Sequence, residues 1–141
     1  MNDYLQLDQQ LCFALYAASR AMTQAYQPLL GPLELTYPQY LVMLVLWEHD
    51  GLNVKELGER LLLDSGTLTP LLKRLETAGL IERRRSQQDE RQVCIRLTDD
   101  GRERREMARS IPLAMAARIG CETQDIAGLR ETLMQLIARL R

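Results

Sequence analysis

The stretch DSGTLTPLLKRLETAGLIERRRSQQDERQVCIRLTDDG, residues 64–101, changes its hydrophobic period part-way along, and this change decides the fold. In its first part a leucine recurs every three or four residues, the spacing that buries one stripe of a helix, at Leu68, Leu71, Leu72 and Leu75. Gly79 then predicts the helix end, as a residue in the left-handed conformation. From Val93 to Leu97 apolar and polar residues alternate, which is typical of a half-buried strand. The order helix, stop, strand, charged turn and strand indicates a winged helix-turn-helix.

The charges of this stretch indicate a nucleic-acid partner. The helix face opposite the leucines carries hydroxyls and cations, at Thr69, Lys73, Arg74 and Thr77. The turn between the strands is polar and is flanked by Arg83, Arg84, Arg85 and Arg91, so we expect a cationic wing tip. Residues 65–97 hold seven basic and four acidic residues, a net charge of +3, whereas the whole chain carries −1. A charge run alone is more often a solvated surface, but a helix, a glycine stop and a basic β-turn in this order favour double-stranded DNA.

Composition limits the remaining possibilities. A chain of 141 residues, 46% hydrophobic and only 5% aromatic, can bury one small helical core. No apolar run approaches the roughly 20 residues of a membrane span, and the first residues lack the cationic start of an export signal, so we expect a cytoplasmic chain with no membrane partner. Three scattered cysteines and one histidine fit neither a disulfide scaffold nor a zinc site, and we expect no metal and no cofactor.

The segment before the winged region is predicted to be helical. Residues 5–29 read as one long helix that ends at Pro28, before the turn Gly31-Pro32. Thr36 and Gln39 have the spacing of a capping box for a helix over 37–49, with His49 as its C-terminal cap. Asn53 is expected to cap a short helix over 54–62, the first of the helix-turn-helix, with inward side chains at Val54, Leu57, Leu61 and Leu62.

The segment after the wing is also predicted to be helical. Thr98 starts a helix of about 20 residues that is interrupted near Pro112, and a last helix covers 123–140. The last helix has a long apolar stripe, at Ile126, Leu129, Leu133, Leu136, Ile137 and Leu140. Together with the apolar face of the first helix, this stripe favours packing against a second copy of the chain. We therefore expect a single chain over 1–141 with dimerisation helices in 1–34 and 102–141 and the winged helix-turn-helix in 35–101.

This order of elements resembles the MarR family of dimeric bacterial repressors across the whole chain. Asp89-Glu90-Arg91 matches the D-x-R feature of that family's wing, in which the arginine enters the minor groove and the aspartate orients it. Three stretches are similar to one branch of the family, the organic hydroperoxide resistance regulators: QLCFALYAASRAMT at 10–23, LTYPQYLVMLVLWEH at 35–49 and LDSGTLTPLLKRLE at 63–76. The resemblance implies a homodimeric repressor that binds a pseudopalindromic operator and leaves it when organic hydroperoxides oxidise an N-terminal cysteine.

The residues expected to meet DNA follow from the helix and the wing. Hydroxyls at the helix N-terminus suit phosphates and base edges, and two cations follow one turn later. The predicted contacts on the helix are Ser65, Thr67, Thr69, Pro70, Lys73 and Arg74, and those on the wing are Arg84, Asp89 and Arg91.

Cys12 has two interpretations. By its own surroundings it is a small buried hydrophobe in an apolar stripe, since no histidine or lysine is near it. The resemblance implies instead that Cys12 is the peroxide-reactive cysteine and that Tyr26 and Tyr37 bond its sulfur; we group Tyr16 of the same stripe with them. Tyr26 lies 14 residues beyond Cys12, about 21 Å along a helix, so the bonding tyrosine must come from the partner chain. Phenol donors stabilise a thiolate, which is the reactive form.

The resemblance leaves the fate of the oxidised sulfur open. Gly120 and the expected capping residue Thr123 place Cys121 in the turn between the last two helices. In two-cysteine members of the branch a C-terminal cysteine of the other subunit forms a disulfide with the oxidised cysteine, and in one-cysteine members an external thiol traps it; we favour the disulfide with Cys121. Cys94, on a wing strand, is interpreted as structural.

Three other functions are considered. A MarR-type repressor could respond to a small anionic or phenolic ligand in a pocket between the dimer and wing regions. A thiol peroxidase is opposed by the absence of a C-x-x-C motif, a βαβ pattern or a catalytic base near Cys12, so an enzyme is not expected. An architectural DNA protein should be basic overall, and this chain is not.

Overall fold

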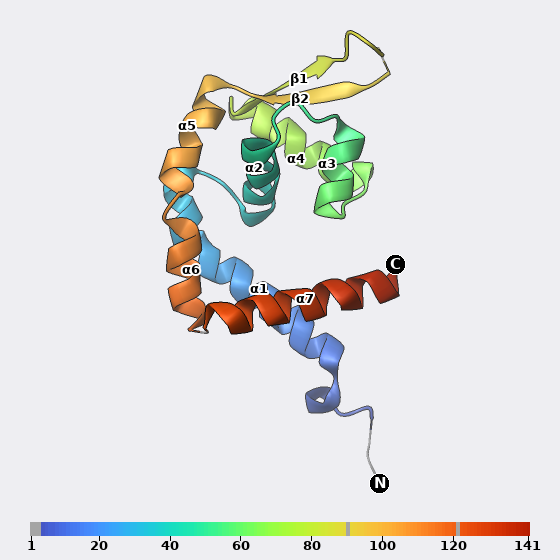
Figure 1. Ribbon diagram of the computed structural model, residues 1–141, viewed down its shortest axis with the longest axis vertical. Coiled ribbons are helices and arrows are strands. Elements are labelled where there is room, and N and C mark those ends of the chain that lie inside the picture. The colour runs from blue at the N-terminus through green and yellow to red at the C-terminus, as the bar shows by residue number, and fades with distance from the viewer. Residues whose placement is uncertain (1–3, 90, 121) are drawn as a thin grey trace. The chain divides into compact units, whose positions relative to one another are not determined.

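The chain forms two compact units in a computed structural model that describes residues 4–89, 91–120 and 122–141. The first unit, Met1–Arg109, contains η1 (Leu7–Gln9), α1 (Leu11–Leu30), η2 (Gly31–Leu33), α2 (Tyr37–Glu48), α3 (Val54–Leu61), α4 (Ser65–Thr77), β1 (Ile81–Arg85), β2 (Val93–Leu97) and α5 (Asp99–Ala108) (Figure 1). The second unit, Ser110–Arg141, contains α6 (Ile111–Ile119) and α7 (Thr123–Leu140). This element order is that of a winged helix-turn-helix flanked by helices, as predicted.

The first helix differs from its predicted bounds at both ends. A single turn of 3-10 helix precedes it, and Gln10 separates the two with an extended backbone. Pro28 lies inside α1 and does not end it. Proline removes one helical hydrogen bond and crowds the preceding turn, but only the last residues of the helix follow it. Burial of Leu30, which is 1% exposed, holds this last turn in place.

The caps of α2 agree with prediction. The Thr36 hydroxyl accepts a hydrogen bond from the backbone N–H of Gln39 at 3.3 Å, and the Gln39 side chain accepts one from the N–H of Thr36 at 2.9 Å. This reciprocal pair is the capping box. His49 is the C-cap, and its backbone N–H donates to the carbonyl of Val45 at 2.7 Å.

One predicted side-chain direction is wrong at the turn from α3 to α4. Asn53 caps α3 as expected, since its Oδ1 accepts from the N–H of Glu56 at 2.8 Å, and Leu57 is fully buried. Leu62, however, was wrongly predicted to point inward: it is 41% exposed. It lies beyond the helix in the left-handed conformation, with φ of 58°, and this turn directs its side chain away from the apolar face of α3.

The recognition helix α4 is buried along its leucines and ends as predicted. Its inward side chains, Leu68, Leu71, Leu72 and Leu75, are all at most 8% exposed. After the C-cap at Ala78, the N–H of Gly79 donates to the carbonyl of Glu76 and the N–H of Leu80 to that of Leu75. These two bonds form a Schellman motif, and Gly79 supplies the positive φ of 79° that it requires.

The wing is a two-stranded antiparallel sheet in which Ile81 pairs with Leu97 and Arg85 with Val93. Ile81, Ile95 and Leu97 are buried, whereas Arg96 between them is exposed, so the predicted alternation is confirmed. The sheet contacts α2, α3, α4 and α5, and the core of the first unit lies among these elements.

The C-terminal helices are separate elements. The Thr98 hydroxyl caps α5 by accepting from the N–H of Gly101 at 3.1 Å. The predicted interrupted helix is instead two helices, because the chain leaves α5 at Arg109 and Pro112 lies in the first turn of α6, where a missing N–H costs little. The last helix has its predicted bounds, but its N-cap is Glu122 and Thr123 is its first helical residue, so Thr123 was wrongly predicted as the cap.

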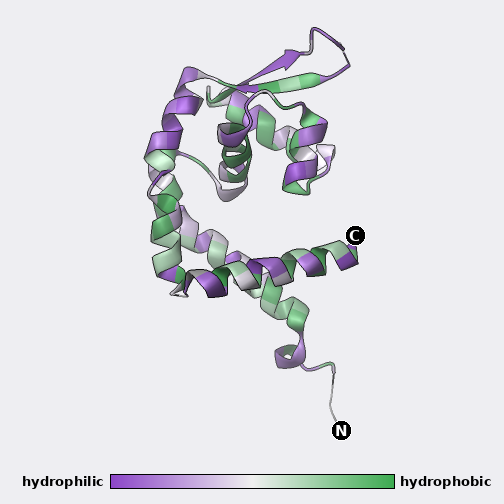
Figure 2. Cartoon of the chain, in the orientation of Figure 1, coloured by the Kyte–Doolittle hydropathy of each residue, from purple (hydrophilic) through white to green (hydrophobic). Residues whose placement is uncertain are grey.

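Apolar side chains stay exposed on α1 and α7, and Figure 2 shows hydrophobic residues interleaved with hydrophilic ones along both helices. The largest exposed fractions are 64% at Leu11 and 63% at Tyr16 on α1, and 60% at Leu129 and 77% at Leu140 on α7. No single described helix is long and apolar enough to cross a membrane; only Leu11–Leu33 and Tyr37–Glu48 taken together, a pair bent by 65°, reach that length and composition.

Replacing Gly101 by alanine is expected to lower the free energy of unfolding by about 1–3 kcal/mol. A Cβ at Gly101 would overlap the carbonyl oxygen of Leu80, and backbone there cannot move without shifting the end of the recognition helix. Gly66→Ala is the matched control, since Gly66 is also in the first turn of a helix but its added Cβ would make only an ordinary contact with Asp64. Urea denaturation followed by circular dichroism measures both variants. A Gly101→Ala variant as stable as Gly66→Ala would show that Gly101 tolerates a side chain.

Candidate functional site

The N-terminus of α4 presents polar groups to solvent. Ser65 and Thr67 are exposed, and the Oδ1 of Asp64 caps the helix by accepting from the N–H of Thr67 at 2.7 Å. Hydrogen bonds from Thr67 hold the pKa of Asp64 below its usual range. Thr69 is half-buried, and its hydroxyl donates to the carbonyl of Ser65 at 2.7 Å. The hydroxyls predicted to meet DNA therefore lie together at one helix end, where the helix dipole favours anions.

The remaining predicted contacts of α4 follow along the helix. Pro70, Lys73 and Arg74 are exposed, whereas the leucines of the same helix are buried. Pro70 lies within α4 and has no N–H to offer the carbonyl of Gly66. The face of α4 that prediction assigned to DNA is thus the face that solvent reaches.

Two of the wing arginines are held by carboxylates. The guanidinium of Arg83 lies 3.1 Å from Glu76, and its backbone N–H also donates to that carboxylate at 3.2 Å. The bonds from Arg83 hold the pKa of Glu76 below its usual range. Arg84 pairs with Glu82 at 2.7 Å. The Arg83–Glu76 pair joins β1 to α4 and the Arg84–Glu82 pair lies within β1, so these contacts neutralise part of the charge of the predicted cationic wing.

The tip of the wing positions Arg91. The Oδ1 of Asp89 accepts from the backbone N–H of Arg91 at 3.0 Å, and the Ser86 hydroxyl accepts from the N–H groups of Gln88 and Asp89 at 3.2 and 3.4 Å. Asp89 thus holds the main chain at Arg91, while the Arg91 side chain is exposed and forms no ion pair within the described part of the chain. Glu90 lies outside the described residues.

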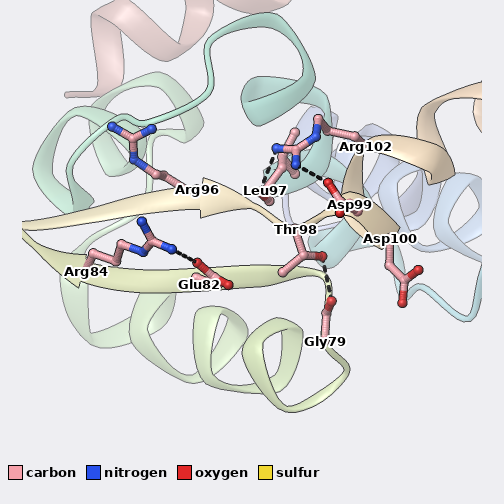
Figure 3. A pocket seen from close by; sticks show the side chains of 9 residues that line it. All are labelled: Gly79, Glu82, Arg84, Arg96, Leu97, Thr98, Asp99, Asp100 and Arg102. Atoms are coloured by element: carbon pink, nitrogen blue, oxygen red, sulfur yellow. Dashed lines mark hydrogen bonds and ion pairs between the residues drawn. The ribbon is translucent and has the colours of Figure 1, made fainter.

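A hollow of about 520 Å³ lies at the base of the wing (Figure 3). Arg84 and Glu82, neighbours on β1, pair at its edge, and Arg102 bonds Asp99 and the carbonyl of Leu97. Arg96 has no ion-pair partner among the described residues. The hollow is polar and its charges are largely paired with one another.

Cys12 lies near the start of α1 and is exposed, so the interpretation as a buried hydrophobe does not hold for the single chain. Tyr16, one turn later, is 63% exposed and has the Arg20 guanidinium 5.7 Å above its ring. Tyr26 lies on the same helix, about 21 Å further along at 1.5 Å per residue. One chain therefore does not bring Cys12 to Tyr26.

Tyr26 and Tyr37, the two tyrosines that the resemblance assigns to the sulfur, lie in contact with each other. Their ring centroids are 4.6 Å apart, although one residue comes from α1 and the other from α2. Tyr40 completes a cluster, with centroids 5.7 Å from Tyr26 and 6.3 Å from Tyr37. Sequence reasoning missed Tyr40, although its position one turn after Tyr37 was a usable signal.

Burial favours the protonated form of the three phenols. It raises the pKa of Tyr26 to about 12, with a further contribution from the neighbouring Tyr37 and Tyr40. Burial also raises the pKa of Tyr37 and of Tyr40 above their usual value. At neutral pH these groups are hydrogen-bond donors, the state needed to bond an anion such as a thiolate. A cavity of about 200 Å³ beside Tyr37 is lined largely by apolar atoms, including those of Leu30, Leu35 and Pro38.

Cys94 and His49 lie on different elements and share no site with Cys12 in the described part of the chain. Cys94 is half-buried in β2, opposite Arg84 in the register and bridged to Asn53 on its other side, which agrees with a structural role. Cys121 lies outside the described residues. His49 lies 3.4 Å from the carboxylate of Glu48. Within the described ranges no group of His, Cys, Asp and Glu is arranged to hold a metal ion.

Comparison with known proteins agrees with this arrangement. Residues 24–107 match the family model described as transcriptional regulator SarA/Rot. The organic hydroperoxide resistance transcriptional regulator of Bacillus subtilis is 51% identical over 138 residues, which cover 98% of this chain and 94% of that protein. The regulator TtmR of Methylorubrum extorquens is 52% identical over 96% of this chain and 69% of that protein.

The chain belongs to the MarR-type winged-helix transcriptional regulators, in the branch of the organic hydroperoxide resistance regulators. The solved structure of AbfR of Staphylococcus epidermidis is similar, with a TM-score of 0.78 and 40% identity over 95% of this chain and 92% of that one. AbfR has also been solved overoxidised on DNA, reduced on DNA and with a disulfide formed. These relatives are transcriptional regulators and not enzymes, and this regulator is likewise a DNA-binding protein and not an enzyme.

Arg91→Ala is expected to weaken operator binding by about 1–3 kcal/mol, since it removes an exposed cation that the Asp89 turn holds at the wing tip. This is roughly a 5- to 150-fold increase in Kd. Arg105→Ala, an exposed arginine on α5 outside the wing, is the control and should bind as the wild type does. Fluorescence anisotropy with labelled operator DNA measures both. An unchanged Kd for Arg91→Ala would remove the wing from the DNA interface.

Proposed function

We propose that this regulator is a repressor that senses organic hydroperoxides through Cys12. The observation that carries the proposal is the contact between Tyr26 and Tyr37, the two residues that the resemblance assigns to the sulfur, at 4.6 Å. They are protonated donors in a partly buried site, and Cys12 is exposed where a second chain could approach it. The similarity to the Bacillus subtilis regulator and to redox forms of AbfR supports the same function.

The working form in this proposal is a homodimer on a pseudopalindromic operator. Residues 1–34 and 102–141 supply the dimerisation helices, and residues 35–101 read the DNA. Exposed apolar side chains on α1, such as Leu11 and Phe13, and on α7, such as Leu129 and Leu140, support this division, because so much apolar surface is costly in water. Tyr26 and Tyr37 of one chain then donate hydrogen bonds to the Cys12 sulfur of the other chain, with Tyr16 nearby.

DNA recognition uses the surfaces described above. The N-terminal hydroxyls of α4, at Ser65, Thr67 and Thr69, together with Pro70, Lys73 and Arg74, meet the major groove. The wing, through Arg84, Asp89 and Arg91, meets the minor groove. Because Arg84 already pairs with Glu82, Arg91 carries more of the wing's contribution.

The redox step oxidises sulfur and reduces the peroxide. The Cys12 thiolate attacks one peroxide oxygen, so an S–O bond forms and the O–O bond breaks. The leaving alkoxide takes a proton to become an alcohol, and the sulfur becomes a sulfenic acid, two electrons more oxidised. In the two-cysteine form, the Cys121 thiol of the other subunit then attacks this sulfur, an S–S bond forms and water leaves. In the one-cysteine alternative an external thiol takes that place.

Cys12→Ser is expected to bind the operator with the wild-type Kd and to stay bound after one equivalent of cumene hydroperoxide, whereas the wild type is released. The serine hydroxyl is close in size to the thiol but is not oxidised. Gel shifts measure release, and mass spectrometry of the wild type locates the oxidation. Release with an unmodified Cys12 would overturn redox sensing and favour the alternative in which a MarR-type repressor responds to a bound ligand.

Cys121→Ser separates the two thiol mechanisms. If the disulfide forms, wild-type protein treated with one equivalent of hydroperoxide gives a dimer-sized band on a nonreducing gel, and this band is absent in Cys121→Ser. Cys94→Ser is the control for an unrelated cysteine and should keep the band. A band that persists in Cys121→Ser, or release of DNA with no band in the wild type, would establish the one-cysteine mechanism.

A further inference from the structure

Tyr40 is the most deeply buried of the three clustered tyrosines. Only 3% of it is exposed, and its ring touches both Tyr26 and Tyr37, at centroid distances of 5.7 and 6.3 Å. Tyr26 and Tyr37 come from different helices, so their relative position depends on the side chains that pack against both. The ring of Tyr40 is one such side chain.

Tyr40 also contacts Trp47, which forms a hydrogen bond outside the tyrosine cluster. Trp47 lies seven residues further along α2, on the same helix face, and its ring meets Tyr40 edge-on at 6.4 Å and 67°. The indole N–H of Trp47 donates to the carbonyl of Gly101, in the first turn of α5, at 2.8 Å. This bond joins α2 to a residue 54 positions later in the chain.

Gly101 lies at the junction of the DNA-reading elements. It packs directly against the carbonyl of Leu80, the residue that closes the end of α4 and precedes β1. Beside it, the Thr98 hydroxyl at the end of β2 donates to the carbonyl of Gly79 at 2.6 Å (Figure 3). A displacement of Gly101 therefore acts on the recognition helix and on both strands of the wing.

We propose that Tyr40 is a positioning residue for the thiol chemistry, holding Tyr26 and Tyr37 in place for the sulfur, and that Trp47 ties this tyrosine cluster to the base of the wing. This proposal rests on the proposed function and concerns how oxidation at Cys12 affects the DNA-binding elements. Oxidation changes the group that the two phenols bond. Because the core around Tyr40 is close-packed, their rearrangement moves Tyr40 and, through Trp47, the carbonyl of Gly101.

Trp47 is the only tryptophan of the chain, so the wild type reports on this link directly. One equivalent of cumene hydroperoxide is expected to shift the tryptophan emission of the free protein, since the indole N–H bond and its surroundings change. Cys12→Ser should give no shift. Release of DNA with Cys12 oxidised and the Trp47 emission unchanged would overturn this inference and leave the proposed function standing. Failure of Cys12 to be oxidised in the wild type would overturn both.

Variants test the positioning role of Tyr40 and the coupling through Trp47 separately. Tyr40→Leu is expected to raise the midpoint of the Cys12 oxidation rate against pH by about one unit, since the phenols are no longer held toward the sulfur. Tyr40→Phe keeps the ring and should retain the wild-type profile. A purely structural role would lower stability without moving this midpoint. A wild-type midpoint in a folded Tyr40→Leu protein would overturn the positioning role.

Trp47→Phe keeps an aromatic ring beside Tyr40 but removes the N–H that Gly101 accepts. Its oxidation rate should stay within about twofold of the wild type, while the ratio of operator Kd between the oxidised and reduced proteins should fall roughly 3- to 10-fold, the effect of one hydrogen bond. An unchanged ratio would overturn the coupling through Trp47. If this variant does not fold, the emission of the wild-type protein decides the question.

Discussion

The packing of Gly101 against the carbonyl of Leu80 is the constraint on which the DNA-binding unit depends. The end of α4, the start of β1, the end of β2 and the first turn of α5 meet there, and a Cβ would not fit between the two backbones. The Schellman motif at Gly79 sets the direction in which the chain leaves α4, and Thr98 bonds back to the carbonyl of Gly79. The recognition helix and the wing are thus fixed to each other by main-chain contacts, which side chains elsewhere then reinforce.

This constraint also shapes the electrostatics. A wing held so close to α4 brings Arg83 against Glu76, and the two-residue repeat of β1 puts Arg84 beside Glu82 on one face of the strand. These ion pairs use charge that the composition of the segment alone would assign to DNA. The cations left to meet phosphates are those without such neighbours in the described part of the chain, such as Arg91, whose main chain Asp89 holds at the wing tip.

The proposed thiol chemistry depends on the opposite situation, because a single chain does not bring Cys12 to Tyr26. Cys12 and Tyr26 share a straight helix and are about 21 Å apart, so no local rearrangement joins them. Packing of α1 on α2 instead gathers Tyr26, Tyr37 and Tyr40, and burial raises the pKa of their hydroxyls. In the proposed homodimer α1 supplies both exposed apolar surface for association and one donor, Tyr26, whereas the donor Tyr37 comes from α2.

Most helices and both strands could be predicted from the amino-acid sequence, because hydrophobic periodicity and helix caps are local. The leucine stripe of α4, the stop at Gly79, the capping box at Thr36 and the alternation in β2 all appear in the structure as predicted. Local patterns misplaced both ends of α1, the direction of the Leu62 side chain and the cap assigned to Thr123.

Family resemblance pointed to Tyr26 and Tyr37, but the residues around them could be identified only from the folded chain. Tyr40 meets Tyr26 and Trp47 meets Gly101 from different helices, and the pairing of Arg83 with Glu76 depends on how β1 approaches α4. Contacts of this kind have no periodic signature. They arise from the close packing of elements in the folded chain, and the sequence of any one element does not contain them.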